Sequence, residues 1–289
     1  MLSSARFALR SSFRPLPFVS RGLSSSAPAK KSALVTGSAQ GIGRAIALRL
    51  ASDGFDVCVN DLPSKAEPLK SVINEIRGLG REAFGTVCDV TKMSEVEETV
   101  QKSVEALGPL NVMVANAGII QMKSLLETTP EDLQKIFEIN VFGVVYSNIA
   151  AGKQFIKQGT GGRIINAARQ CIASYKVTLP VNAAYCATKA AVRSLTQGFA
   201  QEYGPYKITV NAYAPGNTET KMLEEVDIAL AEMNGLQAGE SWKSMAKTTT
   251  LRRNTDPDDV ARLVSFLAGP DSDFITGQTM IVDGGIVFS

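Results

Sequence analysis

Beyond residue 30, short runs of β-branched residues alternate with segments in which apolar residues recur every three or four positions. The short runs predict strands at about 32–36, 56–61, 83–88, 110–115, 162–167, 208–213 and 278–282. The intervening segments predict helices that bury one face, as in the series Ile42, Ala45, Ile46, Leu50 and the series Val96, Val100, Val104, Leu107. This alternation is typical of an α/β fold in which helices flank a doubly wound parallel β-sheet.

No internal repeat and no Pro/Ser-rich linker divides residues 31–289, so we expect a single domain there. Residues 220–250 form the one stretch without a clear pattern, between a predicted strand and the helix that begins at Asp256-Pro257. Ligands of doubly wound sheets bind beyond the carboxyl ends of the strands. A polar excursion at this place is therefore expected to act as a substrate lid.

The composition is that of an ordinary globular protein, except that histidine is absent. Without an imidazole, no serine or cysteine triad with a histidine base can form, and neither can a histidine-containing zinc site. The four cysteines show no CxxC spacing; they are Cys58, Cys88, Cys171 and Cys186. We therefore expect thiols, a reducing compartment and no metal site.

The charge and hydropathy patterns argue against a nucleic acid or a lipid bilayer as partner. Residues 31–289 carry 25 basic and 28 acidic residues, a net charge of −3, and no basic stripe with interleaved aromatic residues. The longest stretch without a charge, residues 106–122, is interrupted by Pro109, Asn111 and Asn116. We expect no membrane span.

Residues 1–30 form a region of different composition. They contain Arg6, Arg10, Arg14, Arg21 and Lys30, whereas the first acidic residue of the chain is Asp53. An Arg- and Ser-rich segment without acids resembles a mitochondrial transit peptide, and RGLSSS at 21–26 resembles a matrix processing motif with cleavage near Lys31. We expect a leader that directs the protein to the mitochondrial matrix; the alternative is a low-complexity tail on a cytoplasmic protein.

The sequence TGSAQGIG at 36–43 follows the first predicted strand and precedes an amphipathic helix. Gly37 permits a tight bend, Gly41 lets the backbone approach phosphate oxygens, and Gly43 lets the helix pack closely, which predicts a dinucleotide site. Asp61 ends the next strand 18 residues after Gly43, where a carboxylate accepts ribose hydroxyls and repels a 2′-phosphate. NAD is therefore favoured over NADP. Arg44 could neutralise a phosphate or remain a solvated helix residue.

Tyr185 and Lys189 lie four residues apart in the predicted helix AAYCATKAAVRSL, on one face. A tyrosine with a pKa near 10 is a poor base at neutral pH. An ammonium about 4 Å away contributes roughly 4 kcal/mol at an effective dielectric constant near 20, which predicts a lower tyrosine pKa and an acid/base role.

Taken together, these segments and four others make residues 31–289 resemble a classical short-chain dehydrogenase/reductase. The matching segments are TGSAQGIG at 36–43, Cys88-Asp89-Val90, Asn116-Ala117-Gly118, Asn140 in EINVFGVV, Tyr185 with Lys189, and Pro215-Gly216 with Thr220. The resemblance implies a Rossmann-type fold and catalysis by Tyr185 and Lys189, with Asn140 holding a proton-relay water. It implies contacts to NAD(H) from Gly37, Gln40, Gly41, Ile42, Gly43, Asp61, Asp89, Val90, Asn116, Ala117, Gly118, Tyr185, Lys189, Pro215, Gly216, Thr218 and Thr220.

Within this family, segments such as VNDL, GGRIINA, ITVNAYAPG and the ending IVF are similar to acetoin/diacetyl reductases, also called butanediol dehydrogenases. This similarity implies a small vicinal diketone or hydroxyketone as substrate, with reductases of other carbonyls or of acyl thioesters as an alternative. The family resemblance also implies a homotetramer built from helices around 131–158 and 183–203.

One position departs from the family pattern. Where the family has its substrate-orienting serine, this chain reads Ala168-Arg169-Gln170, and the spacer to Tyr185 is about three residues longer than usual. The Gln170 amide could replace the hydroxyl, Ser174 could reach in from the longer loop, or the site could be crippled. Arg169 would also favour a negatively charged substrate. Loss of one such donor typically costs about 10²–10³ in rate, so a weakened enzyme and a non-catalytic NAD-binding protein both remain open.

Overall fold

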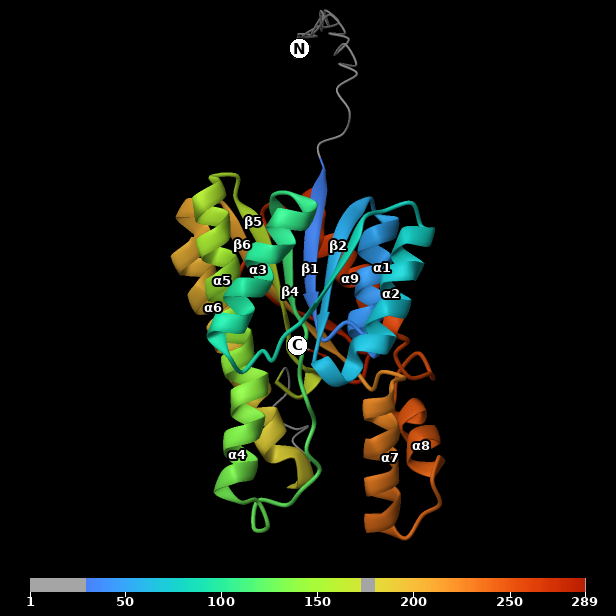
Figure 1. Ribbon diagram of the computed structural model, residues 1–289. Coiled ribbons are helices and arrows are strands. Elements are labelled where there is room, and N and C mark those ends of the chain that lie inside the picture. The colour runs from blue at the N-terminus through green and yellow to red at the C-terminus, as the bar shows by residue number, and fades with distance from the viewer. Residues whose placement is uncertain (1–29, 173–179, 289) are drawn as a thin grey trace, which may run out of the picture.

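The computed structural model describes residues 30–172 and 180–288. Its centre is a seven-stranded sheet with the order β3-β2-β1-β4-β5-β6-β7, in which every pair of neighbours is parallel (Figure 1). The strands are β1 Lys31–Thr36, β2 Phe55–Asp61, β3 Ala83–Val87, β4 Leu110–Ala115, β5 Gly162–Ala167, β6 Ile208–Pro215 and β7 Thr279–Val282. All seven strands predicted from the sequence are confirmed.

Two layers of helices cover the sheet. One face packs against α1 Gly41–Ser52, α2 Ala66–Gly78 and α9 Pro257–Ala268. The other face packs against α3 Met93–Leu107, α5 Gly143–Gln158 and α6 Ala183–Tyr203. Because both faces are buried, the central strands are apolar throughout, as in β4, where Val112, Met113 and Val114 are each at most 1% exposed.

The remaining helices lie at or near the loops. They are α4 Pro130–Phe137, the π-helical turn Glu138–Phe142, α7 Lys221–Asn234, α8 Glu240–Thr248, and the short 3₁₀ turns Pro63–Lys65, Gln170–Ile172, Pro180–Asn182, Gly204–Tyr206 and Pro270–Ser272. Within the described ranges, no helix is long and apolar enough to cross a bilayer.

The direction of the strand order reverses between β1 and β4, since β2 and β3 continue on one side and β5 to β7 on the other. At such a switch point the loops that leave neighbouring strands diverge and open a crevice at the carboxyl ends. The fold therefore positions a ligand site between the segments that follow β1 and β4.

Most of residues 220–250, where the sequence shows no clear pattern, is helical, and the role of this region as a substrate lid stays a prediction. This region forms the pair α7 and α8, which projects beyond the carboxyl end of the sheet (Figure 1). The carboxylate of Asp227, in α7, accepts hydrogen bonds from the backbone N–H groups of Gly239 (2.5 Å) and Trp242 (2.6 Å) at the start of α8. This contact holds the two helices together. The apolar pattern of α7 does not show one buried face in the sequence, because apolar residues lie both on its cavity side and on its outer side, where Ile228 and Met233 are exposed.

All four cysteines are buried and none forms a disulfide. Burial raises the pKa of the Cys58 thiol to about 12, so this side chain behaves as a small apolar residue. Among the described residues, no group of three or more Cys, Asp and Glu is arranged to hold a metal ion.

Candidate active site

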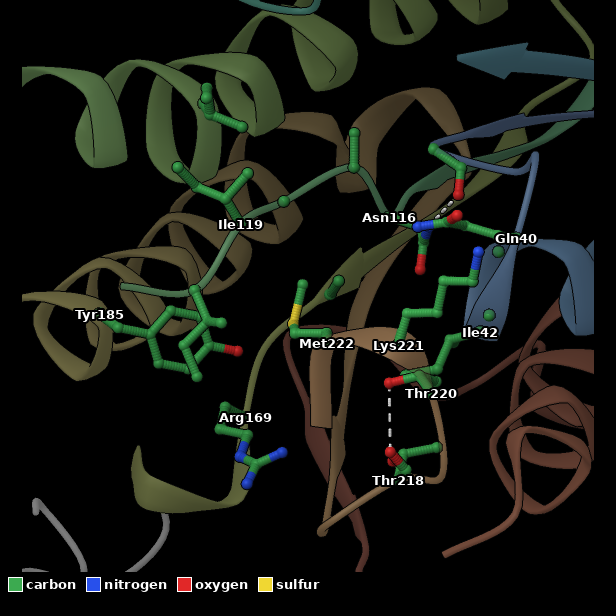
Figure 2. Close-up of a pocket in the computed structure, with 18 of the residues that line it drawn as sticks. Gln40, Ile42, Asn116, Ile119, Arg169, Tyr185, Thr218, Thr220, Lys221 and Met222 are labelled. Atoms are coloured by element: carbon green, nitrogen blue, oxygen red, sulfur yellow. Dashed lines mark hydrogen bonds between the residues drawn. The ribbon is translucent and has the colours of Figure 1, made fainter. Parts of the chain in front are cut away.

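A cavity of about 610 Å³ opens at the carboxyl ends of the strands, at the switch point. Figure 2 shows Tyr185 and Arg169 at one end of it and Gln40, Ile42 and Asn116 at the other. The structure brings most of the predicted site residues to this cavity: Gly37, Gln40, Gly41, Ile42, Gly43, Asp61, Asp89, Val90, Asn116, Ala117, Gly118, Arg169, Tyr185, Lys189, Pro215, Thr218 and Thr220. Three of the predicted site residues do not line the cavity: Gly216, Asn140 and Gln170. A fourth, Ser174, lies outside the described residues.

The glycine-rich turn leaves no room for side chains. Gly37 has a φ of +63°, and a Cβ added there would lie 2.8 Å from the Cα of Ala117. A Cβ at Gly43 would overlap the carbonyl oxygen of Gly37 and lie 2.5 Å from the amide nitrogen of Asn116. The backbone is thus packed tightly against the segment after β4.

The amino end of α1 is open to a ligand. Gln40 is its N-cap residue, makes no side-chain capping hydrogen bond, and is followed by no acidic residue in the first turn. Free N–H groups and the positive end of the helix dipole therefore face the cavity beside Gly41. The turn from Gly37 to Gly43 and the amino end of α1 together form a cradle that fits the pyrophosphate of a dinucleotide.

Asp61 lies at the end of β2 and lines the cavity. Its two carboxylate oxygens accept hydrogen bonds from the backbone N–H groups of Ala39 (3.0 Å) and Leu62 (2.9 Å). Lys65, which the sequence analysis did not single out, also lines this end and contacts the Gln40 side chain. Arg44 is paired with Glu75 of α2, so the interpretation as a solvated helix residue fits the structure better than a phosphate contact.

The segment after β3 and the segment after β4 complete this half of the cavity. Asp89 accepts hydrogen bonds from the backbone N–H (3.0 Å) and the hydroxyl (2.8 Å) of Thr91, which fixes the carboxylate at the rim. Gly118 lies between two functional side chains, because a Cβ there would be 3.1 Å from Asn140 Oδ1 and 3.5 Å from Lys189 Nζ.

Asn140 belongs to the π-helical turn between α4 and α5 and is fully buried. Its Oδ1 accepts from the backbone N–H of Ile119 (2.8 Å), and its Nδ2 donates to the carbonyl of Ile119 (2.9 Å) and to Thr188 Oγ1 (3.2 Å). The side chain therefore fixes the strand-end segment that carries Gly118, and a role in holding a relay water stays a prediction.

Tyr185 and Lys189 share one face of α6, and both are buried. Burial raises the pKa of Tyr185 to about 12, and the positive charge of Arg169 acts in the opposite direction. The pKa of Lys189 is lowered to about 8, chiefly by burial, and the positive charge of Arg169 contributes to this lowering. The Lys189 ammonium donates to the carbonyl of Ala167 (2.9 Å) and lies 5.7 Å from the centre of the Tyr185 ring.

The prediction that Lys189 by itself brings the Tyr185 pKa down toward neutrality is therefore wrong for the protein alone. The cost of removing the hydroxyl from water dominates the Tyr185 pKa, and the Lys189 ammonium is itself desolvated and bonded to Ala167 instead. Tyr185 is fully protonated at neutral pH, which suits it to donate a proton.

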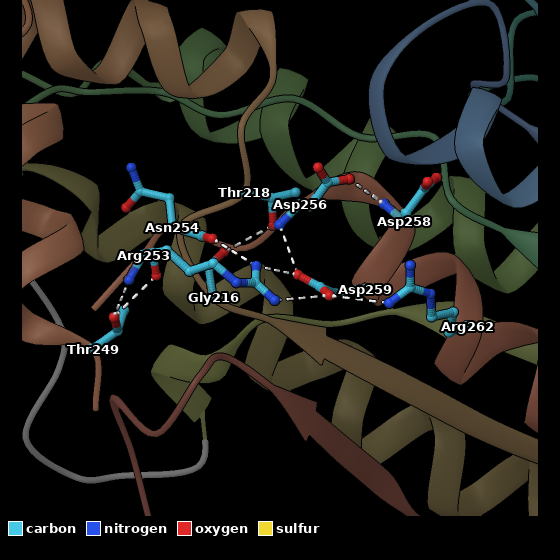
Figure 3. A network of polar contacts seen from close by, with 9 residues as sticks. All are labelled: Gly216, Thr218, Thr249, Arg253, Asn254, Asp256, Asp258, Asp259 and Arg262. Atoms are coloured by element: carbon cyan, nitrogen blue, oxygen red, sulfur yellow. Dashed lines mark hydrogen bonds and ion pairs between the residues drawn. The ribbon is translucent and has the colours of Figure 1, made fainter. Parts of the chain in front are cut away.

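The loop after β6, which carries Gly216 and Thr218, lies beside the segment before α9 in Figure 3, and backbone hydrogen bonds join the two segments. Thr255 donates its backbone N–H to the Asn217 carbonyl (2.8 Å) and accepts from Glu219 N–H (2.9 Å). Beside this bridge, the Arg253 guanidinium binds both carboxylate oxygens of Asp259, at 2.5 and 3.0 Å. The Arg253–Asp259 pair therefore braces the segment that carries Thr255, and the Thr255 backbone holds the loop of Gly216 and Thr218. Neither contact could be read from the sequence, because both depend on the fold.

Arg169 reaches the same loop from the opposite side. Its guanidinium donates to the carbonyl of Gly216 through Nη1 (2.7 Å) and to Asn217 Oδ1 through Nη2 (2.7 Å). The neighbouring Gln170 is only 3% exposed, does not line the cavity, and leaves its Oε1 without a partner in the described structure. The structure therefore does not bring the Gln170 amide to the place of the family's serine.

The remaining wall is apolar and comes largely from the helical pair α7 and α8. Its side chains are Met222, Leu223, Val226, Leu230 and Met245, with Ile119 and Ile120 opposite. The sequence analysis placed a lid here but named none of these residues, since helix boundaries are needed to tell which side chains face inward.

Comparison with known proteins agrees with this geometry. A family model described as "Enoyl-(Acyl carrier protein) reductase" matches residues 37–287. The L-2,3-butanediol dehydrogenase of Corynebacterium glutamicum is 46% identical over 259 residues, covering 90% of this chain and 99% of that protein. The diacetyl reductase [(S)-acetoin forming] of Staphylococcus epidermidis is 42% identical, covering 89% of this chain and 99% of that protein.

Solved structures are similar over the same span. A single-site variant of actinorhodin polyketide ketoreductase with NADPH has a TM-score of 0.83 and 32% identity, covering 89% of this chain and 97% of that one. An NAD⁺-bound xylitol dehydrogenase has a TM-score of 0.80 and 32% identity, covering 88% and 98%. The chain belongs to the short-chain dehydrogenase/reductase family, whose members bind nicotinamide cofactors, and it is an oxidoreductase that acts on CH–OH groups or the corresponding carbonyls.

The packing of the glycine-rich turn generates a first prediction. A Gly43→Ala exchange inserts a Cβ into the Gly37 carbonyl and should cost about 1–3 kcal/mol of stability through overpacking. It should also displace the turn and weaken NADH binding at least tenfold, measured by NADH fluorescence titration. Gly78→Ala, where nothing lies within 4 Å, is the matched control and should leave both quantities unchanged or slightly raise stability. Equal NADH affinity in the two variants would contradict the proposed cradle.

Proposed function

We propose that this protein is an NAD(H)-dependent oxidoreductase that interconverts small vicinal diketones or hydroxyketones, such as diacetyl and acetoin, with their alcohols. The observation that carries the proposal is the shared cavity that holds both Tyr185 with Lys189 and the glycine-rich cradle. The substrate class is supported by the butanediol dehydrogenase and the diacetyl reductase to which the chain is similar.

The residues present fit a nicotinamide dinucleotide. Gly37, Gly41 and Gly43 would hold its pyrophosphate against α1, Asp61 its adenosine ribose, and the loop from Pro215 to Thr220 its nicotinamide. When bound, this cofactor supplies or accepts the hydride.

The chain's own residues handle the proton. In reduction, the Tyr185 hydroxyl donates its proton to the substrate oxygen as negative charge develops there. The adjacent charges of Lys189 and Arg169 stabilise the phenolate that remains, and Arg169 already opposes the effect of burial on the Tyr185 pKa. Asn140 holds the Ile119 backbone in place, and the apolar side chains of α7 and α8 exclude water.

NAD rather than NADP is the proposed cofactor because Asp61 lies at the strand end where a 2′-phosphate would have to fit. Its carboxylate would repel that phosphate, and Arg44 is already engaged by Glu75.

A second candidate is a protein that binds NAD without turnover, and the specific observation in its favour is Arg169 at the family's serine position. A third candidate function is reduction of an acyl thioester, and it is favoured by the matching family model, which is described as an enoyl-(acyl carrier protein) reductase. Turnover over a panel of diketones and thioesters separates the three.

We further propose that the protein acts in the mitochondrial matrix as a homotetramer. The first part is supported by the acid-free, arginine-rich residues 1–30. The homotetramer is supported by exposed apolar side chains on the helices of residues 131–158, where Phe142 is 46% and Ile156 is 41% exposed.

The first test of this proposal is Tyr185→Phe. This exchange should keep NADH affinity and lower kcat for diacetyl reduction by at least about 10²-fold, because it removes the proton donor and little binding area. Initial rates of NADH oxidation and a fluorescence titration give the two quantities. Tyr206→Phe, which removes a hydroxyl from a tyrosine that is 49% exposed, is the control and should match the unmodified protein. Undiminished turnover in Tyr185→Phe would exclude the mechanism.

Cofactor choice gives another prediction. The unmodified protein should have a kcat/KM with NADH at least tenfold above that with NADPH, and Asp61→Ala should narrow this ratio by removing the repulsion. Glu67→Ala, a nearby surface carboxylate on α2, should leave the ratio alone. Equal use of both cofactors by the unmodified protein would show that Asp61 does not select between them.

The leader is tested separately. Residues 1–30 fused to a fluorescent reporter should direct it into mitochondria, since the membrane potential draws positive charge inward. Replacing Arg6, Arg10, Arg14 and Arg21 with Gln should leave the reporter in the cytosol, whereas replacing them with Lys should preserve import. A cytosolic reporter with the unmodified leader would identify residues 1–30 as a tail.

A further inference from the structure

Arg169 places a positive charge in the wall of the cavity without a carboxylate to neutralise it. The guanidinium is part-buried, and none of the ion pairs among the described residues includes it. A cation that is partly removed from water is costly unless it is paired. Its position next to the reacting centre therefore points to a ligand that brings the missing negative charge.

The guanidinium is held in place by the loop after β6. Two of its five N–H groups are used, one on the carbonyl of Gly216 and one on Asn217 Oδ1, both at 2.7 Å. The remaining N–H groups have no acceptor in the described part of the chain. An arginine fixed in this way is prepared to bind an oxygen anion with little loss of conformational entropy.

The same guanidinium is close to the proton donor. Figure 2 shows Arg169 and Tyr185 at the same end of the cavity, with the Arg169 guanidinium extending toward the loop that carries Thr218. Glu138, Lys135 and Lys189 also line the cavity, and among the described residues none of them is paired with Arg169: Glu138 accepts from Gln134, and Lys189 donates to Ala167. A carbonyl oxygen that accepts the Tyr185 proton would thus have a cation beside it.

The pyrophosphate cradle at Gly41 belongs to the opposite end of the cavity from Arg169, as Figure 2 shows by the positions of Gln40 and Ile42. A phosphate of the cofactor is therefore not the anion that Arg169 is placed to meet. The anion must belong to the substrate.

We propose that Arg169 is the substrate-orienting residue of this enzyme and that it selects vicinal dicarbonyl compounds in which the second carbonyl group is a carboxylate, that is, 2-oxo acids and the matching 2-hydroxy acids. This inference rests on the proposed function and names the substrate class of the same site. Guanidinium and carboxylate groups match in geometry and charge, which a serine hydroxyl cannot provide.

The reaction balances without a further reactant. The 2-oxo carbon gains a hydride from NADH and is reduced, its oxygen gains the proton of Tyr185, and the carboxylate keeps its charge on Arg169. A solvent proton then restores Tyr185, so that one NADH and one proton are consumed for each 2-hydroxy acid and NAD⁺ formed.

An isosteric pair of substrates tests the proposal. Pyruvate differs from diacetyl only in having O⁻ in place of one methyl group, so the ratio of their kcat/KM values isolates the effect of the charge. In the full chain, Arg169→Gln and Arg169→Ser should shift this ratio about 10²-fold toward diacetyl, the usual order for truncating one partner of a buried charge pair. Arg169→Lys, which keeps the positive charge but loses the paired N–H donors of the guanidinium, should shift the pyruvate/diacetyl ratio less. Asn217→Ala removes one anchor of the guanidinium and should shift the ratio in the same direction, by less than Arg169→Gln does.

A binding measurement complements the kinetics. Oxamate, an unreactive mimic of pyruvate, should bind to the unmodified protein saturated with NADH and should lose at least tenfold in affinity in Arg169→Gln, measured by calorimetry. Thermal unfolding of each variant shows whether it is folded, and Arg169→Lys should retain part of the oxamate affinity.

The outcomes separate this inference from the proposed function. A ratio that is the same in Arg169→Gln as in the unmodified protein, with oxamate binding unchanged, would overturn the role of Arg169 while diacetyl reduction still stands. Arg169-dependent oxamate binding without turnover of any carbonyl would instead support the anion site and refute the oxidoreductase mechanism.

Discussion

The site depends on the way the Asn116 side chain joins the ends of three strands. Its amide nitrogen donates to the carbonyls of Thr36 (2.8 Å) and Gly37 (3.0 Å) after β1, and its oxygen accepts from the Tyr213 hydroxyl of β6 (2.7 Å). Leaving such buried groups unpaired costs about 1–3 kcal/mol each. Because this contact fixes the turn against β4, it determines the space in which Gly43 begins α1 and in which a dinucleotide can lie.

On the other side of the cavity, Arg169 joins strand ends in a comparable way. It links the end of β5 to the loop after β6, which Thr255 also holds through two backbone hydrogen bonds. The apolar sheet supports both arrangements but does not determine them. What positions the reacting groups is a small number of polar contacts between segments that are far apart in sequence.

The strands and the cofactor turn could be predicted because their signals are local. Strands buried on both faces give continuous apolar runs, and the turn needs glycine at fixed spacings. The pKa values of Tyr185 and Lys189 could not be predicted, because Lys189 bonds to Ala167, 22 residues away, and both side chains are desolvated by the fold. The same limit applies to the neighbours Arg169 and Gln170, because the fold alone decides that Arg169 lines the cavity and Gln170 does not. It also applies to α7 and α8, which are held together by the tertiary contact of Asp227.

An arginine in place of a serine changes the electrostatics of the whole reacting centre. Arg169 acts with burial to lower the pKa of Lys189, which is about 8, so that two cations repel each other at the reacting centre. A neutral substrate would leave that repulsion in place. A carboxylate bound to Arg169 would offset the repulsion and keep Lys189 protonated while Tyr185 gives up its proton. Substrate charge and acid strength would then be coupled through one residue, so that a negatively charged substrate is turned over more efficiently than a neutral one.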